Sequence, residues 1–125
     1  MIRARTPADT SSARGLGRQV EADSHLKAPE MRPWSKVVVH EDGRTVSVSW
    51  VRGVAQGLHS VAVAYGNDCV QIGTRMGTRP AFWNRSGYVV LRMIVEHTVV
   101  RLREPLRGRR IEAMAAEDGP VTRIP

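Results

Sequence analysis

Alternation of apolar and polar side chains predicts a β-hairpin over residues 36–49. The runs Lys36–His40 and Thr45–Ser49 flank the tetrad Glu41-Asp42-Gly43-Arg44. If the chain reverses at Asp42-Gly43, the valines form two cross-strand pairs, Val39 with Val46 and Val37 with Val48. All four valines then share one face, and two serines, Ser47 and Ser49, share the other. Turn chemistry and alternation agree on one register, which predicts antiparallel β structure.

A second hairpin is predicted over residues 59–72. Residues 59–65 alternate valines and Tyr65 with small side chains, and the turn Gly66-Asn67-Asp68 returns the chain as residues 69–72. With Asn67-Asp68 as the central pair, Tyr65 faces Val70 and Val63 faces Ile72.

The remaining apolar runs, residues 88–95 and 98–103, are crowded with Val, Ile and Thr and therefore favour strands over helix. Leu91, Met93 and Val95 occupy odd positions, whereas Val100 and Leu102 occupy even ones. We therefore expect the inward-facing phase to slip near Glu96-His97, through a bulge or a tight turn. Pro105 should end the last long strand, residues 111–114 should add a short edge strand, and residues 76–87 should form a loop.

These elements predict an all-β fold: a small antiparallel sandwich or meander of six to seven strands over residues 33–125. A chain of 125 residues suits a single domain. Residues 1–32 carry few large apolar side chains and no periodicity, so we expect them to be a disordered N-terminal tail. Because Met31 stands just before the first predicted strand, it is an alternative translation start to Met1.

Three segments resemble a group of small actinobacterial β-domain proteins that have no established activity. They are residues 42–50 (D-G-R-T-V-S-V-S-W), residues 57–63 (G-L-H-S-V-A-V) and residues 99–110, which close on P-L-R-G-R-R. The closing pattern V-x-L-x-x-P-L-x-G-R is the most specific, and the likeness covers residues 32–119. Many members carry two cysteines, but Cys69 matches neither place, so the resemblance implies a β fold and no disulfide.

Charge and composition restrict the class of protein without naming a function. The net charge is +7, and 17 of the 19 cationic residues are Arg. This skew is typical of a GC-rich genome, although a polyanion partner would also suit a basic chain. No apolar run is long enough to span a bilayer and the first thirty residues lack an apolar signal core, so we expect a cytoplasmic protein with no membrane partner. Cys69, the single cysteine, is expected to be a small buried hydrophobe.

Few residues suggest catalysis. None of the four histidines has a second His or Cys at ligand spacing, and no G-x-S-x-G motif is present, so the sequence predicts no catalytic residue, metal or cofactor. An enzyme with a dispersed site, built from His59 or His97 with Asp68, is the alternative that remains.

Two features favour a non-catalytic binding or interaction domain, with a protein or an anionic polymer as partner. One is a loop with arginines and aromatics, and the other is a basic edge. The candidate binding residues are Arg79, Phe82, Trp83 and Arg85 in the loop, and Arg101, Arg103, Arg107, Arg109 and Arg110 in the edge. The aromatics could instead plug the sandwich, and the arginines could guard a sheet edge. If both features faced one side, single-stranded nucleic-acid binding, the second hypothesis, would gain support. The oligomeric state is not predictable.

Overall fold

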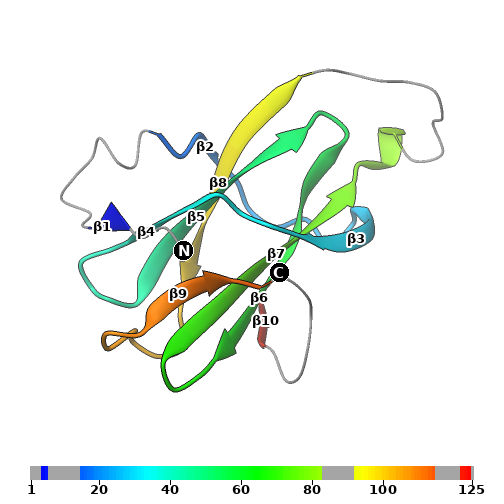
Figure 1. Cartoon of the computed structure of the whole chain (residues 1–125). Helices are drawn as coiled ribbons and strands as arrows, with labels where there is room; N and C mark the ends of the chain where they lie inside the picture. The colour runs from blue at the N-terminus through cyan, green and yellow to red at the C-terminus, as the bar shows by residue number, and fades with distance from the viewer. Residues whose placement is uncertain (1–3, 6–14, 83–91, 115–121, 125) are drawn as a thin grey trace.

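Two β-sheets form the fold. The structure, a computed structural model, describes residues 4–5, 15–82, 92–114 and 122–124, and in this part of the chain it contains no α-helix (Figure 1). The elements are β1 (Ala4–Arg5), β2 (Arg18–Gln19), β3 (Lys27–Arg32), β4 (Lys36–Val39), β5 (Thr45–Gly53), β6 (Gln56–Tyr65), β7 (Cys69–Thr78), the 3-10 helix η1 (Pro80–Phe82), β8 (Met93–Arg101), β9 (Arg110–Ala113) and β10 (Thr122–Ile124).

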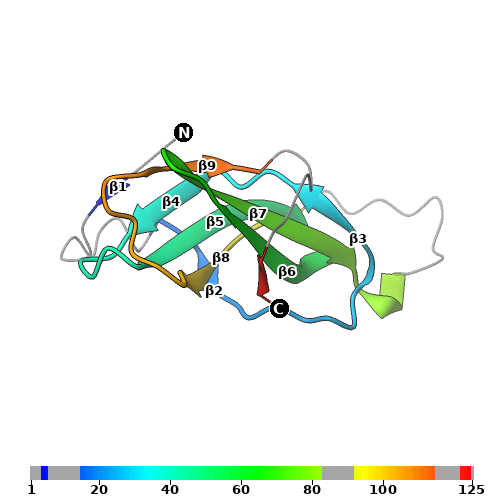
Figure 2. The same ribbon diagram turned by 90° about the horizontal axis from the view of Figure 1, so that it is seen from below.

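The two sheets are mostly antiparallel. One has the strand order β1-β4-β5-β8-β2, and the other has the order β10-β6-β7-β3, with β9 also paired to β7. The strands β5 and β6 follow one another in the chain but belong to different sheets (Figure 2). Only Val54 and Ala55 join them, so the two hairpins are brought face to face. The all-β sandwich prediction is confirmed.

Both predicted hairpin registers are confirmed. Val39 pairs with Val46 and Val37 with Val48, while Tyr65 pairs with Val70 and Val63 with Ile72. The inward faces of the two hairpins meet in one buried cluster. The indole N–H of Trp34 donates to the carbonyl of Ile72 at 2.7 Å, which ties the chain before β4 to the opposite sheet. Apolar burial on both inner faces supplies the main stabilisation of such a sandwich.

Residues 15–32 differ from the predicted disordered tail. This segment, here called the strap, runs along the edge of one sheet as β2 and along the edge of the other as β3. It buries Leu16 and Leu26, and the Leu16 carbonyl accepts a hydrogen bond from the Ser49 hydroxyl at 2.9 Å. Composition alone missed the strap because exposed sheet edges, rather than its own apolar content, supply its hydrogen-bond partners. Residues 1–3 and 6–14 lie outside the described part.

The predicted phase slip near Glu96-His97 is wrong. β8 pairs with β5 without interruption, from Arg101 opposite Thr45 to Met93 opposite Gly53. The even residues face inward throughout, so Glu96 is buried, whereas Met93 is 70% exposed. The prediction assumed that every apolar residue points inward. Residues 88–91 lie outside the described part.

Of two further expectations near the ends of β7, the loop beginning at Met76 is wrong and the short strand near residues 111–114 is confirmed. Met76, Gly77 and Thr78 belong to this strand and not to a loop. Gly77 is needed there because a Cβ would lie 2.7 Å from the side chain of Leu26 in the strap. The short strand expected near residues 111–114 is present as β9, and it pairs with β7 in the parallel direction.

Candidate functional site

The structure places Arg79, the described side chain of the predicted loop feature, and the predicted basic edge at opposite ends of the sandwich. Arg79 follows the last residue of β7, whereas Arg110 pairs with Cys69, the first residue of that strand. Ten extended residues separate these points by about 30 Å. We call them the pocket end and the turn end. Trp83 and Arg85 lie outside the described residues, as does the side chain of Phe82, so Arg79 alone represents the loop feature at the pocket end.

At the turn end, Arg109 stabilises a loop. Its side chain is only 14% exposed, and its guanidinium donates to the carbonyls of Leu106 (2.9 Å), Pro105 (2.7 Å) and Gly66 (3.2 Å). The same group forms an ion pair with Glu104 at 2.8 Å. A guanidinium with this many partners is a structural group and offers little to a ligand.

Three of the other turn-end arginines, Arg101, Arg103 and Arg110, also have partners. Arg101 lies 3.8 Å from Asp42, and Arg110 forms a 2.6 Å ion pair with Glu112. Arg103 stacks its guanidinium 4.5 Å above the Tyr65 ring. Arg107 is exposed and makes no hydrogen bond or ion pair with the described residues. The predicted basic edge did not include Arg44, which donates hydrogen bonds to the carbonyls of Leu102 and Arg103.

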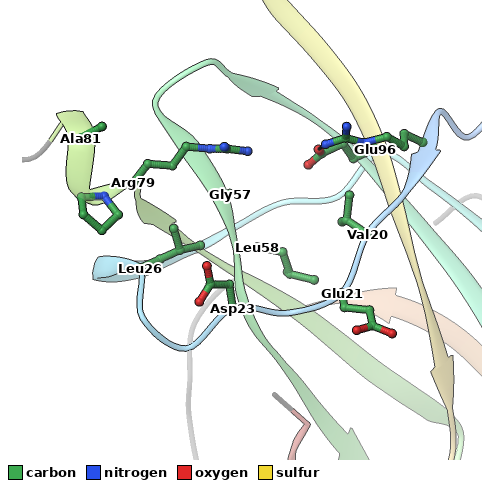
Figure 3. A pocket seen from close by; sticks show the side chains of 11 residues that line it. Val20, Glu21, Asp23, Leu26, Gly57, Leu58, Arg79, Ala81 and Glu96 are labelled. Atoms are coloured by element: carbon green, nitrogen blue, oxygen red, sulfur yellow. Dashed lines mark hydrogen bonds and ion pairs between the residues drawn. The ribbon is translucent and has the colours of Figure 1, made fainter.

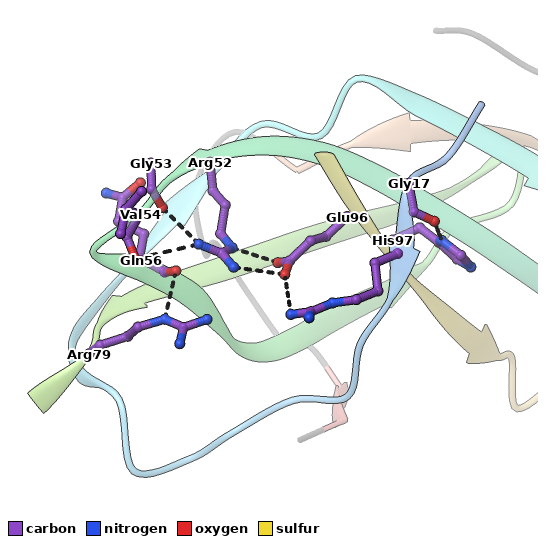
Figure 4. Close-up of polar contacts among 9 residues, drawn as sticks. Gly17, Arg52, Gly53, Val54, Gln56, Arg79, Glu96 and His97 are labelled. Carbon is purple, nitrogen blue, oxygen red and sulfur yellow. Dashed lines mark hydrogen bonds and ion pairs between the residues drawn. The ribbon is translucent and has the colours of Figure 1, made fainter. Parts of the chain in front are cut away.

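The pocket end contains a buried ion pair. The Arg52 Nε lies 2.7 Å from Oε1 of Glu96, and its Nη2 lies 2.8 Å from Oε2, with the two side chains only 3% and 2% exposed (Figure 4). The Arg52 Nη1 also donates to the carbonyl of Gly53 at 2.9 Å. Arg18 in the strap adds a longer contact, 3.4 Å from Nη2 to Oε2 of Glu96. The pair is bidentate, the strongest geometry for these groups.

The environment keeps Glu96 ionised. Burial by itself raises the pKa of this carboxyl, but the hydrogen bonds and charges of Arg52 and Arg18 outweigh it and leave the pKa below its usual value. A carboxylate held in this state is poorly suited to act as a general acid. Alternation in the sequence carries part of the signal for this pair, since Arg52 has the inward parity of Trp50 and Glu96 has that of Val100.

A pocket of about 460 Å³ opens beside this ion pair (Figure 3). The strap forms one wall, and the start of β6 and helix η1 form the others. Arg79 reaches across Gly57 toward Glu96 in Figure 3, and its Nε would lie 4.0 Å from a Cβ on Gly57. The lining residues that matter for recognition are Arg18, Glu21, Asp23 and Arg79, with Val20, Leu26 and Leu58 as apolar surface.

The outer face of β5 and β8 carries an apolar patch. Val51 lies directly opposite Val95 and is 48% exposed. Met93 and Val99 continue the same alternation on β8 and are exposed as well. In the part of the chain that the structure describes, no other large hydrophobic side chain is exposed. We call these four residues the β5–β8 face.

The dispersed enzyme site does not assemble. His59 lies in β6 near the pocket end, and Asp68 lies in the turn beyond the other end of that strand. The His97 imidazole lies 2.9 Å from the Gly17 carbonyl. Cys69 is half-buried, and desolvation together with Glu112 raises the pKa of its thiol, which disfavours the reactive thiolate.

Among the described residues, no group of three or more His, Cys, Asp or Glu side chains could hold a metal ion. No helix in these segments has the length and apolarity that crossing a membrane requires.

Compared with protein-family models, curated proteins and solved structures, the chain matches none of them. The resemblance to small actinobacterial β-domain proteins therefore stays a prediction.

Proposed function

We propose that the chain is a non-catalytic protein-interaction domain that docks its partner on the β5–β8 face. The observation that carries this proposal is the gathering of Val51, Met93, Val95 and Val99 on one face of two paired strands. Single exposed apolar residues are ordinary, but apolar residues that adjoin one another, as Val51, Val95 and Met93 do here, are typical of an interaction site. We also propose a cytoplasmic setting, which suits the single unpaired cysteine Cys69.

The charges around the β5–β8 face indicate the chemistry of the partner. Arg101 continues the outward alternation of β8, Lys36 lies opposite the outward Ser49, and Arg92 precedes Met93. All three are cations, so a matching partner has an apolar surface bordered by Asp and Glu. Two copies of this chain would bring cationic borders together, which favours a different protein over self-association.

A capture experiment with the full chain tests this function. Tagged protein is incubated with native lysate, with and without nuclease, beside the variant Val51→Lys/Val95→Glu and the control Arg107→Ala. We expect nuclease-resistant capture that the control retains and the face variant loses. Capture that is unchanged in the face variant, or that nuclease abolishes, would overturn the proposal. A dimer in light scattering that the face variant dissociates would assign the face to a second copy.

Binding of single-stranded nucleic acid is the second candidate, and one observation favours it. The Arg103 guanidinium carbon lies 4.5 Å from the centre of the Tyr65 ring, and Arg107 is exposed nearby at a hollow that also includes Asn67. A stacked guanidinium beside an uncommitted one suits a base and its phosphate. Binding of an oligonucleotide should appear at low salt, fall steeply as salt rises and weaken in Arg103→Ala/Arg107→Ala. The absence of a mobility shift at low salt would remove this candidate.

A further inference from the structure

The pocket between the strap and the sandwich is separate from the β5–β8 face. Its lining includes Glu96, which points inward from β8, whereas Val95 and Val99 point outward from the same strand. Its volume of about 460 Å³ lies within the range of small-molecule sites.

The buried acid at the back of this pocket is already neutralised. Both oxygens of Glu96 accept hydrogen bonds from Arg52, and one of them also contacts Arg18. One guanidinium, Arg52, matches the single charge of Glu96. A cationic ligand would therefore gain little at Glu96, and Arg18 retains donors for an anion.

Arg79 supplies the second donor. Its Nε lies 3.5 Å from the Gln56 carbonyl, a long contact, and its terminal nitrogens make no hydrogen bond or ion pair with the described residues. The side chain extends over Gly57 toward Glu96 (Figure 3). Arg18 approaches from the strap with its side chain 72% exposed. Two guanidinium groups directed at one pocket match the geometry of a carboxylate.

The other lining residues restrict the charge and the body of the ligand. Asp23 accepts hydrogen bonds from the backbone and ring of His25, and its pKa is lowered chiefly by the backbone bond, so it stays anionic. With Glu21 beside it, this carboxylate would repel a second negative charge on the ligand. Leu26, Leu58 and Val20 provide an apolar surface for a hydrocarbon body.

We infer that this pocket binds a small monocarboxylate with an apolar body. The carboxylate would lie on Arg79 and Arg18, and the hydrocarbon would pack on Leu26, Leu58 and Val20. Phosphate and polyphosphates should bind poorly because the strap carboxylates oppose a second charge.

Titration of the full isotope-labelled chain with hexanoate tests this inference by NMR. We expect saturable shifts of the amides of Gly57, Leu58 and Arg79, with hexanol, hexylamine and phosphate each at least about tenfold weaker. The variant Arg79→Gln should weaken hexanoate about tenfold or more, as loss of a charged hydrogen bond implies. Arg107→Gln, at the turn end, serves as the matched control and should bind like the parent chain.

Several outcomes would overturn the inference. These are no saturable shift at the pocket, hexanol binding as tightly as hexanoate, or unchanged affinity in Arg79→Gln. Because Arg79 is exposed, Arg79→Gln should unfold at the same temperature as the parent. A matching unfolding temperature excludes misfolding as the cause of weaker hexanoate binding. The single docking variant Val51→Lys leaves Val95 beside Gly17 of the strap unchanged, and it should still bind hexanoate while losing partner capture, so this site and the proposed function are tested separately.

Discussion

Arginine has different structural roles at the two ends of the sandwich. At the pocket end, Arg52 is buried against the equally buried carboxylate of Glu96. At the turn end, Arg109 is nearly buried but holds loop carbonyls and the half-buried Glu104. Loop carbonyls can turn to water when their donor is lost, whereas a buried charge cannot. The same residue type should therefore differ in its importance for stability according to what its partner would do alone.

Removing the carboxylate of Glu96 should have the largest effect. Glu96→Gln leaves the charge of Arg52 buried and unmatched, which should lower the free energy of unfolding by about 3–5 kcal/mol. Replacement of both partners, Arg52→Met with Glu96→Leu, should recover most of this loss because no buried charge remains. Urea denaturation at pH 7 measures both variants. Equal losses in the single and double variants would show that the charge is not the cause, and exposed Glu30→Gln should stay within about 0.5 kcal/mol of the parent.

Two glycines with positive φ, one at each end, allow the cost of adding a side chain to be compared between the two ends. Gly17 in the strap has φ +81°, and a Cβ would lie 2.2 Å from the Val95 carbonyl oxygen. Gly43 in the β4–β5 turn has φ +66° with no atom near a Cβ. Gly17→Ala should therefore lose about 2–4 kcal/mol, from left-handed strain and overlap together, and Gly43→Ala about 1–2 kcal/mol from strain alone. Similar losses in the two variants would mean that the strap does not press on β8.

The turn-end arginines provide a smaller contrast. Arg109→Ala removes hydrogen bonds to three carbonyls and one ion pair, and we expect a loss of about 1–3 kcal/mol. Arg107→Ala should change stability by less than about 0.5 kcal/mol, since Arg107 is exposed and makes no polar contact with the described residues. Thermal and urea unfolding of both variants measure the difference. A loss in Arg107→Ala as large as that in Arg109→Ala would contradict the assignment of Arg109 as the structural group.

The hairpins could be predicted from sequence because all their information is local. Turn residues and alternation fix the register of residues 36–49, and the structure reproduces both valine pairs. The strap could not be predicted in this way. Its partners are edges of β8 and β7, about eighty and fifty residues along the chain, and its own composition is polar.

The candidate sites show the same difference between what local sequence predicts and what only tertiary structure decides. Alternation along β5 and β8 places Arg52 and Glu96 on the inward face. The sequence prediction assumed that only apolar residues face inward, and it therefore did not include this pair. The basic edge was located correctly along the chain, yet its acids, Asp42 and Glu112 among them, come from other turns and strands. Spacing shows which arginines gather, and only tertiary structure shows which are already paired.

The smallest expected effect concerns Asp42, the turn-end carboxylate that contrasts with Glu96. The Thr45 hydroxyl donates to Asp42 at 2.7 Å, and with the backbone N–H groups of Arg44 and Thr45 it lowers the pKa of this carboxyl to about 2. Because the folded pKa lies below the ordinary value of about 4, Asp42 stabilises the fold above pH 4. That contribution should be lost as the pH falls from about 4 toward 2.

Asp42→Asn should therefore flatten the fall in urea midpoint between pH 4 and pH 2 relative to the parent chain. Glu41→Gln is the matched control, since the neighbouring carboxylate makes no hydrogen bond with the described residues, and its profile should follow the parent. Identical slopes for Asp42→Asn and the parent would show that the turn does not discriminate between ionised and protonated Asp42. The acid sensitivity of the domain would then lie with the other carboxyls whose pKa is lowered, which are Asp23, Glu112 and Glu96, the last buried with its partner.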